Sequence, residues 1–361
     1  MTNSKPRVTV LMPVYNGEKY MREAIDSILG QTYHDYEFVI INDGSTDGSV
    51  KIIQSYRDKR IRFIDNEKNI GISSTLNKGI ELATGEYIVR MDSDDISLPT
   101  RIEKQVKFMD NYPEVGVCGT WIKYIGVPWR PWRSAIYKYT AKPRDIKARS
   151  LFNSGFAHPS VIMRRSLLEK FQLKYDPQHL DAEDYGLWQK CSFCFPLANI
   201  PEVLLVYRVH FESMTNSDKN IEFETVQRVN RLSIQNLDIG FSPEELLIYR
   251  NYPIDFKPEF LIKFHSWLQR LQKANSLKQV YPEPEFSQAL SEEWFSACCR
   301  SSGLGIKVWF IFWRMPFSRV AKFGTKRIIK LFLKCITRWY SRKPALQISA
   351  KDLRTTNKIS H

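Results

Sequence analysis

The sequence has no hydrophobic run long enough to cross a membrane. Its best apolar stretch, residues 308–313, falls far short of the roughly 18 to 20 residues that a spanning helix needs. The opening residues, MTNSKPR, contain no apolar core, so we expect no secretory signal peptide. Cysteine is scarce, and the single CxxC, Cys191 to Cys194, has no second Cys or His pair at zinc spacing. These absences favour structural cysteines and a reducing, cytosolic location.

Acidic residues are missing from the C-terminal part of the chain. Between Arg300 and Lys351 there are thirteen Lys and Arg and no Asp or Glu, which is nearly all of the net charge of +14. From Arg319 to Arg338 the cations recur every three or four residues, which predicts a basic amphipathic helix that binds an anionic membrane surface through residues 304–340. The alternative is a helix packed on the rest of the protein with a solvated basic face. No recognised nucleic-acid-binding motif accompanies the charge, so we expect no nucleic-acid partner.

Strand and helix patterns alternate four times in the first third of the chain. We expect strands over 8–12, 38–41, 61–64 and 87–91, and helices over 17–29, 50–56, 72–83 and 99–109. Such alternation predicts an α/β fold with a mostly parallel sheet flanked by helices. Further strands are expected over 115–124, 161–163 and 203–209, and a helix ending near residue 194.

The remainder of the chain has a helical pattern without a chemical motif. We predict an α/β domain over 1–216, a helical accessory region over 217–300, the basic segment over 301–345 and a disordered tail over 346–361. The 361 residues are enough for one large domain with an appendage, or for two domains.

Polar loops follow three of the predicted strands. They are residues 13–16, residues 42–47, and a loop with the carboxylates Asp92, Asp94 and Asp95. Ligands of parallel sheets bind at the carboxyl ends of the strands. Asp92 and Asp94 can both reach one hard cation such as Mg²⁺ or Mn²⁺, which would neutralise a diphosphate. The alternative is a polar loop before a helix, with Ser97 as its N-cap and Pro99 in the first turn.

Other segments carry weaker signals. The aromatic and cationic loop 129–133 suits sugars and phosphates, but it also fits an ordinary surface loop. His158 can contact a substrate or be satisfied by local hydrogen bonds. Asp181, Glu183 and Asp184 lie at the start of a helix, where either one of them acts as a general base or they only favour the helix dipole. Arg208 and His210 end a strand with side chains that can face a diphosphate.

Several stretches together resemble glycosyltransferase family 2, the inverting enzymes of the GT-A fold, over roughly residues 7–216. They are VTVLMPVYNGEKYMREAIDSILGQTY, FVIINDGSTDGS, NIGISSTLNKGIELATGEYIVRMDSDD, FAHPSVIMRR, AEDYGLW and YRVHFESMT. The resemblance implies a nucleotide pocket with Asp43 on the uracil or equivalent base, and its other residues are Pro13, Val14, Tyr15 and Glu18. It also implies that Asp92 lies near the ribose and metal, and that Asp94 ligates the metal.

For the reacting groups, the resemblance implies Asp184 as catalytic base with Glu183 beside it, His158 on the acceptor side, and His210 as a diphosphate or metal contact. The QxxRW motif of processive relatives is absent, which favours transfer of one or a few sugars. We therefore expect a UDP-sugar donor and a glycan or lipid-linked acceptor in cell-surface polysaccharide synthesis, at the inner face of the cell membrane. The alternative, a nucleotidyltransferase making nucleotide sugars, would need a glycine-rich phosphate loop after the first strand, and PVYNGEKY is not one.

Overall fold

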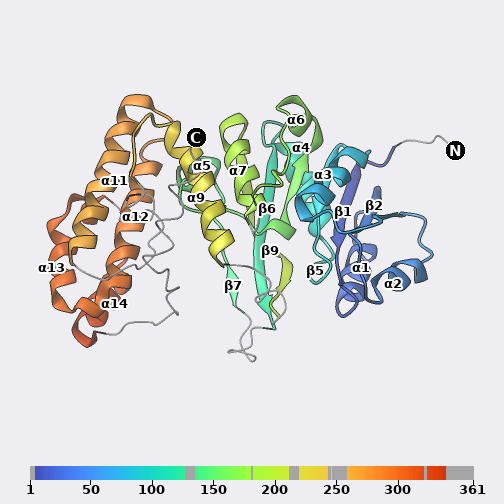
Figure 1. Ribbon diagram of the computed structural model, residues 1–361, viewed down its shortest axis with the longest axis horizontal. Coiled ribbons are helices and arrows are strands. Elements are labelled where there is room, and N and C mark those ends of the chain that lie inside the picture. Colours follow the sequence, from blue (N-terminus) through green and yellow to red (C-terminus); the bar gives the residue numbers. More distant parts are fainter. Residues whose placement is uncertain are drawn as a thin grey trace, which may run out of the picture. The chain divides into compact units, whose positions relative to one another are not determined.

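The computed structural model describes residues 5–126, 135–179, 182–210, 219–242, 245, 258–320 and 323–338, drawn as ribbons in Figure 1. The chain divides into two compact units, Met1–Val229 and Asn230–His361. The predicted boundary at residue 216 precedes α9 (Lys219–Gln235), the helix that carries the chain from one unit to the other. The loop 129–133, Asp181 and the predicted tail 346–361 lie outside the described residues.

One sheet of nine strands organises the described part of the first unit. Its strand order is β3-β2-β1-β4-β8-β6-β9-β5, with β7 paired to β6. The strands are β1 (Val8–Val14), β2 (Tyr36–Asn42), β3 (Ile61–Asp65), β4 (Tyr87–Arg90), β5 (Ile96–Ser97), β6 (Val117–Ile125), β7 (Ile136–Tyr137), β8 (Ile162–Arg164) and β9 (Leu197–Arg208).

The first four strands are parallel, as the sequence predicts. β1 is central among them and pairs with β2 and with β4, so that Val8 lies opposite Tyr36 on one side and Tyr87 on the other. The carboxyl ends of β1, β2 and β4 therefore meet at one edge of the sheet. β8 runs antiparallel between β4 and β6, and β9 is parallel to β6. The two-residue strands β5 and β7 were not predicted, because two residues carry no periodicity.

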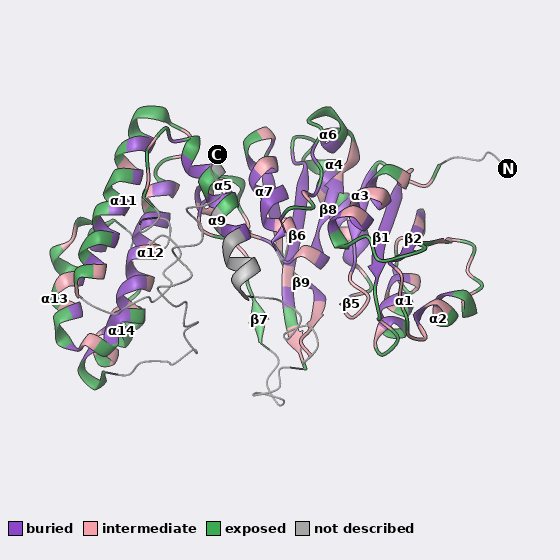
Figure 2. Ribbon diagram, in the orientation of Figure 1, coloured by how far each residue is buried: buried purple, intermediate pink, exposed green. Residues whose placement is uncertain are grey.

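Helices cover both faces of this sheet, and alternation along β1 decides which face each residue meets. Val10 and Met12 belong to a core shared with α1 (Met21–Leu29), α2 (Ser49–Ser55) and α4 (Arg101–Asn111). Leu11 faces the opposite core, which contains side chains of α3 (Ile72–Leu82), α5 (Pro143–Arg149), α6 (Arg165–Lys170) and α7 (Glu183–Cys194). Figure 2 shows the central strands buried along most of their length.

The helix after the acidic loop, α4, does not begin where the alternative interpretation of that loop placed it. Ser97 is not its N-cap: Ser97 lies in β5, where it pairs with Leu205 of β9. The N-cap is Thr100, which makes no side-chain capping hydrogen bond, and the helix begins at Arg101. The alternative that explained the loop through Ser97 capping is therefore wrong, because strand pairing holds that segment.

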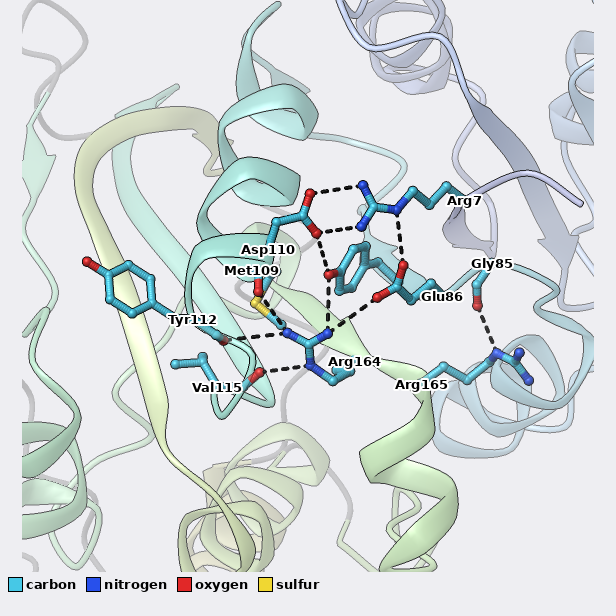
Figure 3. A network of polar contacts seen from close by, with 10 residues as sticks. Arg7, Gly85, Glu86, Met109, Asp110, Tyr112, Val115, Arg164 and Arg165 are labelled. Carbon is cyan, nitrogen blue, oxygen red and sulfur yellow. Dashed lines mark hydrogen bonds and ion pairs between the residues drawn. The ribbon is translucent and has the colours of Figure 1, made fainter.

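At the amino ends of β1 and β4, a cluster of ion pairs joins the sheet to α4 (Figure 3). Arg7 donates to Oδ2 of Asp110 at 2.9 Å and to Glu86 at 3.0 Å. The Tyr87 hydroxyl donates to Oδ1 of Asp110 at 2.7 Å, and Arg164 donates to the Met109 carbonyl at 2.8 Å. This network fastens α4 to the edge of the sheet where the parallel strands begin. The acidic loop lies at the opposite edge.

The second unit is helical in its described residues. Its helices are α11 (Pro258–Lys278), α12 (Glu285–Arg300), the 3₁₀ turns η2 (Ser301–Leu304) and η3 (Pro316–Arg319), α13 (Ile306–Arg314) and α14 (Thr325–Thr337). Trp267 and Trp294 are fully buried within it. The predicted basic segment contains α13 and α14, each with one buried side, and none of the described helices is long and apolar enough to span a bilayer.

Candidate functional site

A cleft of about 380 Å³ lies at the carboxyl ends of β1, β2 and β4. Its walls come from the loop after β1, from Asp43 after β2, from the loop after β4, and from Tyr207 and His210 at the end of β9. Asn69 and Ile72, at the start of α3, complete it. The predicted residues among its lining are Pro13, Val14, Tyr15, Asp43, Asp92, Asp94 and His210. Loops distant in the sequence thus share one hollow.

The three carboxylates after β4 converge on one point. Asp92, Asp94 and Asp95 each offer an oxygen, and these oxygens all lie within 4.8 Å of one another. The Asp92 carboxylate forms an ion pair with buried Arg90. Oδ1 of Asp95 accepts a hydrogen bond from the Arg208 amide at 2.8 Å, which fixes the end of β9 against the acidic loop.

Burial and crowding make the charge on these carboxylates costly. Burial, with the neighbouring negative charges of Asp94 and Asp184, raises the pKa of Asp92 to about 6, and Arg90 opposes this shift. Burial also raises the pKa of Asp95 well above its ordinary value, with the charges of Asp92 and Asp94 adding to it. An added cation would offset this repulsion.

The donor set fits a hard divalent cation. Carboxylate oxygens are the ligands that Mg²⁺ and Mn²⁺ prefer. In addition, Oδ2 of Asp95 is buried and has no hydrogen-bond partner among the described residues. A buried carboxylate oxygen without a donor is uncommon in folded proteins, and a bound ion would satisfy it.

Asp43 occupies the part of the cleft beside α3 and organises the backbone there. Its carboxylate accepts hydrogen bonds from the Ile70 amide at 2.9 Å and the Gly71 amide at 3.1 Å. Gly71 has a φ of +86°, a left-handed conformation that glycine adopts without strain. Asp43 thus shapes the loop before α3 while it lines the cleft. The carboxylate of Glu18 accepts from the Gly48 amide at 2.6 Å, and Glu18 is not among the described residues that line the cleft.

The start of α7 carries the predicted catalytic pair. Oδ1 of Asp184 accepts a hydrogen bond from the Tyr185 amide at 2.6 Å. Oε1 of Glu183 lies 4.0 Å from Nδ1 of His158, which belongs to the 3₁₀ turn η1 (His158–Ser160). Nε2 of His158 lies 2.8 Å from the Tyr175 hydroxyl. Burial, helped by the positive charge of Arg90, holds the pKa of His158 well below its usual range, so the imidazole is neutral.

Comparison with known proteins decides the family. Residues 9–171 match the family model described as "Glycosyl transferase family 2". An uncharacterized glycosyltransferase of Haemophilus influenzae is 33% identical over 237 residues, which cover 63% of this chain and 73% of that relative. The chain belongs to glycosyltransferase family 2. The amylovoran biosynthesis glycosyltransferase AmsE of Erwinia amylovora is also similar, with 30% identity over 205 residues, 55% of this chain and 75% of AmsE.

Solved structures show the fold of this family 2 enzyme. The crystal structure of S. aureus TarS 1-349 in complex with UDP-GlcNAc has a TM-score of 0.55 at 17% identity, and covers 94% of this chain and 95% of that one. The mannosyltransferase PcManGT from Pyrobaculum calidifontis, in complex with GDP-Man and Mn²⁺, has a TM-score of 0.50 at 18% identity, over 92% of this chain and 87% of that one. The predicted GT-A fold is confirmed, and so is the prediction of a glycosyltransferase.

Two residues of this glycosyltransferase site were missed by the sequence-based reasoning. Arg90 ends the buried strand β4 and pairs with Asp92, and a cation inside an apolar strand run was a usable signal. Tyr175 contacts His158 from a segment without helix or strand, and nothing in the sequence around it indicated this role.

Proposed function

We propose that this glycosyltransferase moves one or a few sugars from a nucleoside-diphosphate sugar to a glycan or lipid-linked acceptor, by a single displacement that inverts the anomeric centre. In this proposal Asp184 is the general base with Glu183 beside it in the catalytic pair, and His158 lies on the acceptor side. Pro13, Val14, Tyr15 and Asp43 contact the nucleotide.

One observation carries this proposal: loops distant in the sequence bring Asp43, Asp92 and Asp94 to one cleft, where oxygens of Asp92, Asp94 and Asp95 lie within 4.8 Å of one another. After burial and the charge of Asp94, the charge of Asp184 is a further cause of the raised pKa of Asp92. A base candidate at the start of α7 and the acidic loop after β4 therefore belong to one electrostatic environment. That environment suits a reaction in which a proton is accepted on one side while a phosphate leaves on the other.

The chemistry assigns each group a task. The acceptor hydroxyl is a poor nucleophile near neutral pH, so the Asp184 carboxylate takes its proton as the oxygen bonds to the anomeric carbon. The bond from that carbon to the phosphate oxygen breaks with its electron pair, and the nucleoside diphosphate leaves. Asp92 and Asp94, with His210 beside Asp94, would hold a divalent ion, Mn²⁺ or Mg²⁺, that offsets the charge of the leaving group.

The donor base is proposed as uridine from the family resemblance. The two structural neighbours are described as complexes with UDP-GlcNAc and with GDP-Man, so the shared fold is compatible with either base. Both neighbours nevertheless bind a nucleotide sugar, which supports that class of donor for this chain.

We place the reaction at the inner face of the cell membrane, with the protein bound peripherally, in the synthesis of a cell-surface polysaccharide. The relative AmsE is named for amylovoran biosynthesis, which supports the pathway class. The excess of Lys and Arg beyond Arg300 supports the membrane placement.

The test is a panel of UDP, GDP, dTDP and ADP sugars, assayed for hydrolysis and transfer with and without Mn²⁺. At least one donor should be consumed only with metal. Asp184→Asn should then keep donor binding and lose about 10² or more in rate, the usual cost of removing a general base.

The matched control is Asp145→Asn, which removes a first-turn acid from α5 on the same face of the sheet. If first-turn acids only favour helix dipoles, both variants should behave alike and keep their rate. The proposal is contradicted if Asp184→Asn keeps its full rate, or if the donor is consumed at the same rate with and without Mn²⁺.

A further inference from the structure

Two helices of the second unit carry large apolar side chains on their solvent side. On α13 they are Ile306, Phe310 and Trp313, and on α14 they are Ile329, Leu333 and Ile336. Phe310 is 67% exposed and Leu333 is 53% exposed. Figure 2 shows exposed positions along both helices.

The spacing of these residues is the same in both helices. Each set follows the pattern i, i+4, i+7, which forms one stripe along a helix with 3.6 residues per turn. The buried residues are Val308 and Phe312 in α13, and Leu331 and Cys335 in α14. At about 100° per residue, each stripe is centred roughly 150° around the helix from its buried side. The stripes therefore point away from the core that the helices already serve.

The two stripes belong to adjoining helices. The ring of Trp309 in α13 packs edge-on against Phe332 in α14, with their centroids 5.0 Å apart. Trp309 also packs against Trp313 of the α13 stripe, at 5.7 Å. An aromatic contact thus links the helices beside the stripes.

Core packing does not explain these residues. A surface helix ordinarily directs one apolar stripe to the core and polar residues to water. Here each helix has a buried side and a second apolar stripe on the other side. Contiguous exposed apolar surface of this kind marks an interaction site.

Cations lie along one flank of each stripe. On the helical wheel, exposed Lys307 and Arg314 of α13 and exposed Lys326 and Lys330 of α14 fall next to the stripe on the same side. No Asp or Glu occurs between Arg300 and Lys351 to offset them. The occupant must therefore combine an apolar layer with negative charge at its border, which describes an anionic bilayer interface.

We propose that the α13 and α14 stripes form a docking surface for an anionic lipid bilayer, with the apolar side chains among the acyl chains and the flanking cations at the headgroups. The inference rests on the proposed function for its membrane placement, and it deepens that function by naming the residues that make the contact. The sequence predicted that one basic amphipathic helix binds the membrane. The structure instead offers two helices, α13 and α14, each with an apolar stripe of the same spacing.

The experiment measures partition of the full chain onto vesicles of equal parts phosphatidylglycerol and phosphatidylcholine, by sedimentation. The double variant Phe310→Ser/Leu333→Ser should bind at least about tenfold more weakly, because two large apolar side chains no longer insert. Lys326→Gln/Lys330→Gln should weaken binding to these vesicles and reduce its salt dependence. Leu277→Ser is the matched control, since Leu277 is 76% exposed on α11, outside the stripes, and its loss should change nothing.

Unchanged partition of the Phe310/Leu333 variant overturns the proposal. So does a result in which that variant converts a dimer to a monomer by light scattering without changing lipid binding, because the stripes would then be a contact between copies. Metal-dependent donor hydrolysis is measured on every variant and should equal wild type. If the wild type and all variants fail to hydrolyse a donor, but lipid binding still depends on the stripes, the proposed function is refuted and the docking surface is supported.

Discussion

Nε2 of His210 lies 2.9 Å from Oδ2 of Asp94. The contact joins the residues that follow β9 to the acidic loop after β4, and the His210 ring packs 5.1 Å from the ring of Tyr20. The imidazole therefore restrains one of the carboxylates proposed to hold the metal, whether or not it contacts the ion itself. Groups that orient a metal-binding carboxylate contribute strongly to metal affinity.

Replacing His210 should therefore weaken metal binding. His210→Ala is expected to raise the Mn²⁺ concentration for half-maximal donor hydrolysis by about 10- to 100-fold, the range typical of outer-shell partners. A Mn²⁺ titration of the hydrolysis rate checks this. His34→Ala removes an exposed imidazole elsewhere and should leave the titration unchanged. An unshifted midpoint in His210→Ala would show that the histidine contributes nothing to the metal site.

Arg90 supplies the positive charge beneath Asp92 when no cation is bound. Arg90→Met should lower the melting temperature, because Asp92 loses its ion-pair partner. Breaking a fully buried ion pair costs ~3–5 kcal/mol of stability. Since Asp92 is partly exposed, breaking this pair should cost less than that. Mn²⁺ with UDP should stabilise this variant more than wild type, since the cation takes over the role of the lost guanidinium. Thermal melts with and without Mn²⁺ and UDP measure both effects.

The comparison variant is Lys174→Met, whose ammonium lies 2.7 Å from Glu81 in a pair with both side chains more than half exposed. Its melting temperature should change little, because exposed ion pairs contribute about 0–1 kcal/mol. If the stability lost in Arg90→Met is the same with and without Mn²⁺ and UDP, the site does not exchange one cation for another.

The network around Arg7 predicts a pH dependence of stability. Hydrogen bonding to Arg7, partly opposed by burial and aided by Tyr87, lowers the pKa of Asp110 below its usual value near 3.9. As pH falls, Asp110 in the unfolded chain takes up its proton before Asp110 in the folded protein does. The contribution of the Arg7–Asp110 interaction to stability is therefore complete above the pKa of the unfolded state and is lost as pH falls through the pKa of the folded state. The difference in melting temperature between wild type and Arg7→Met should shrink from pH 6 to pH 3. A constant difference over that range would contradict this linkage.

Much of the fold was predictable because parallel strands leave long apolar runs. The runs over 8–12 and 38–41 lie in β1 and β2, and the run over 87–91 overlaps β4. Parallel pairing of these strands brings the loops after them to one edge of the sheet. What was not predictable depends on contacts between distant segments. The antiparallel insertion of β8 and the pairing of Ser97 with Leu205 have no local signal, because partner choice is decided by packing across the sheet.

The candidate site divides in the same way. Asp92, Asp94 and Asp43 stand out by their position after strands, whereas the side chains that surround them do not. Arg90 was hidden inside a strand run, and Tyr175 lies in an irregular segment. The exposed stripes of α13 and α14 could not be predicted from the sequence, because periodicity alone does not say which side of a helix meets the core.

The neutral state of His158 leads to the last prediction. Burial and the positive charge of Arg90 hold the pKa of His158 well below its usual value, so the imidazole is neutral near pH 7. His158→Gln should lower the transfer rate through the lost contact with Tyr175, but it should leave the position of the acid limb of the rate profile unchanged, because the proposed base is the Asp184 carboxylate. Rates measured from pH 5 to pH 8 on wild type, His158→Gln and Asp184→Asn separate the two groups. Loss of the acid limb in His158→Gln would make the histidine the titrating base and displace Asp184 from that role.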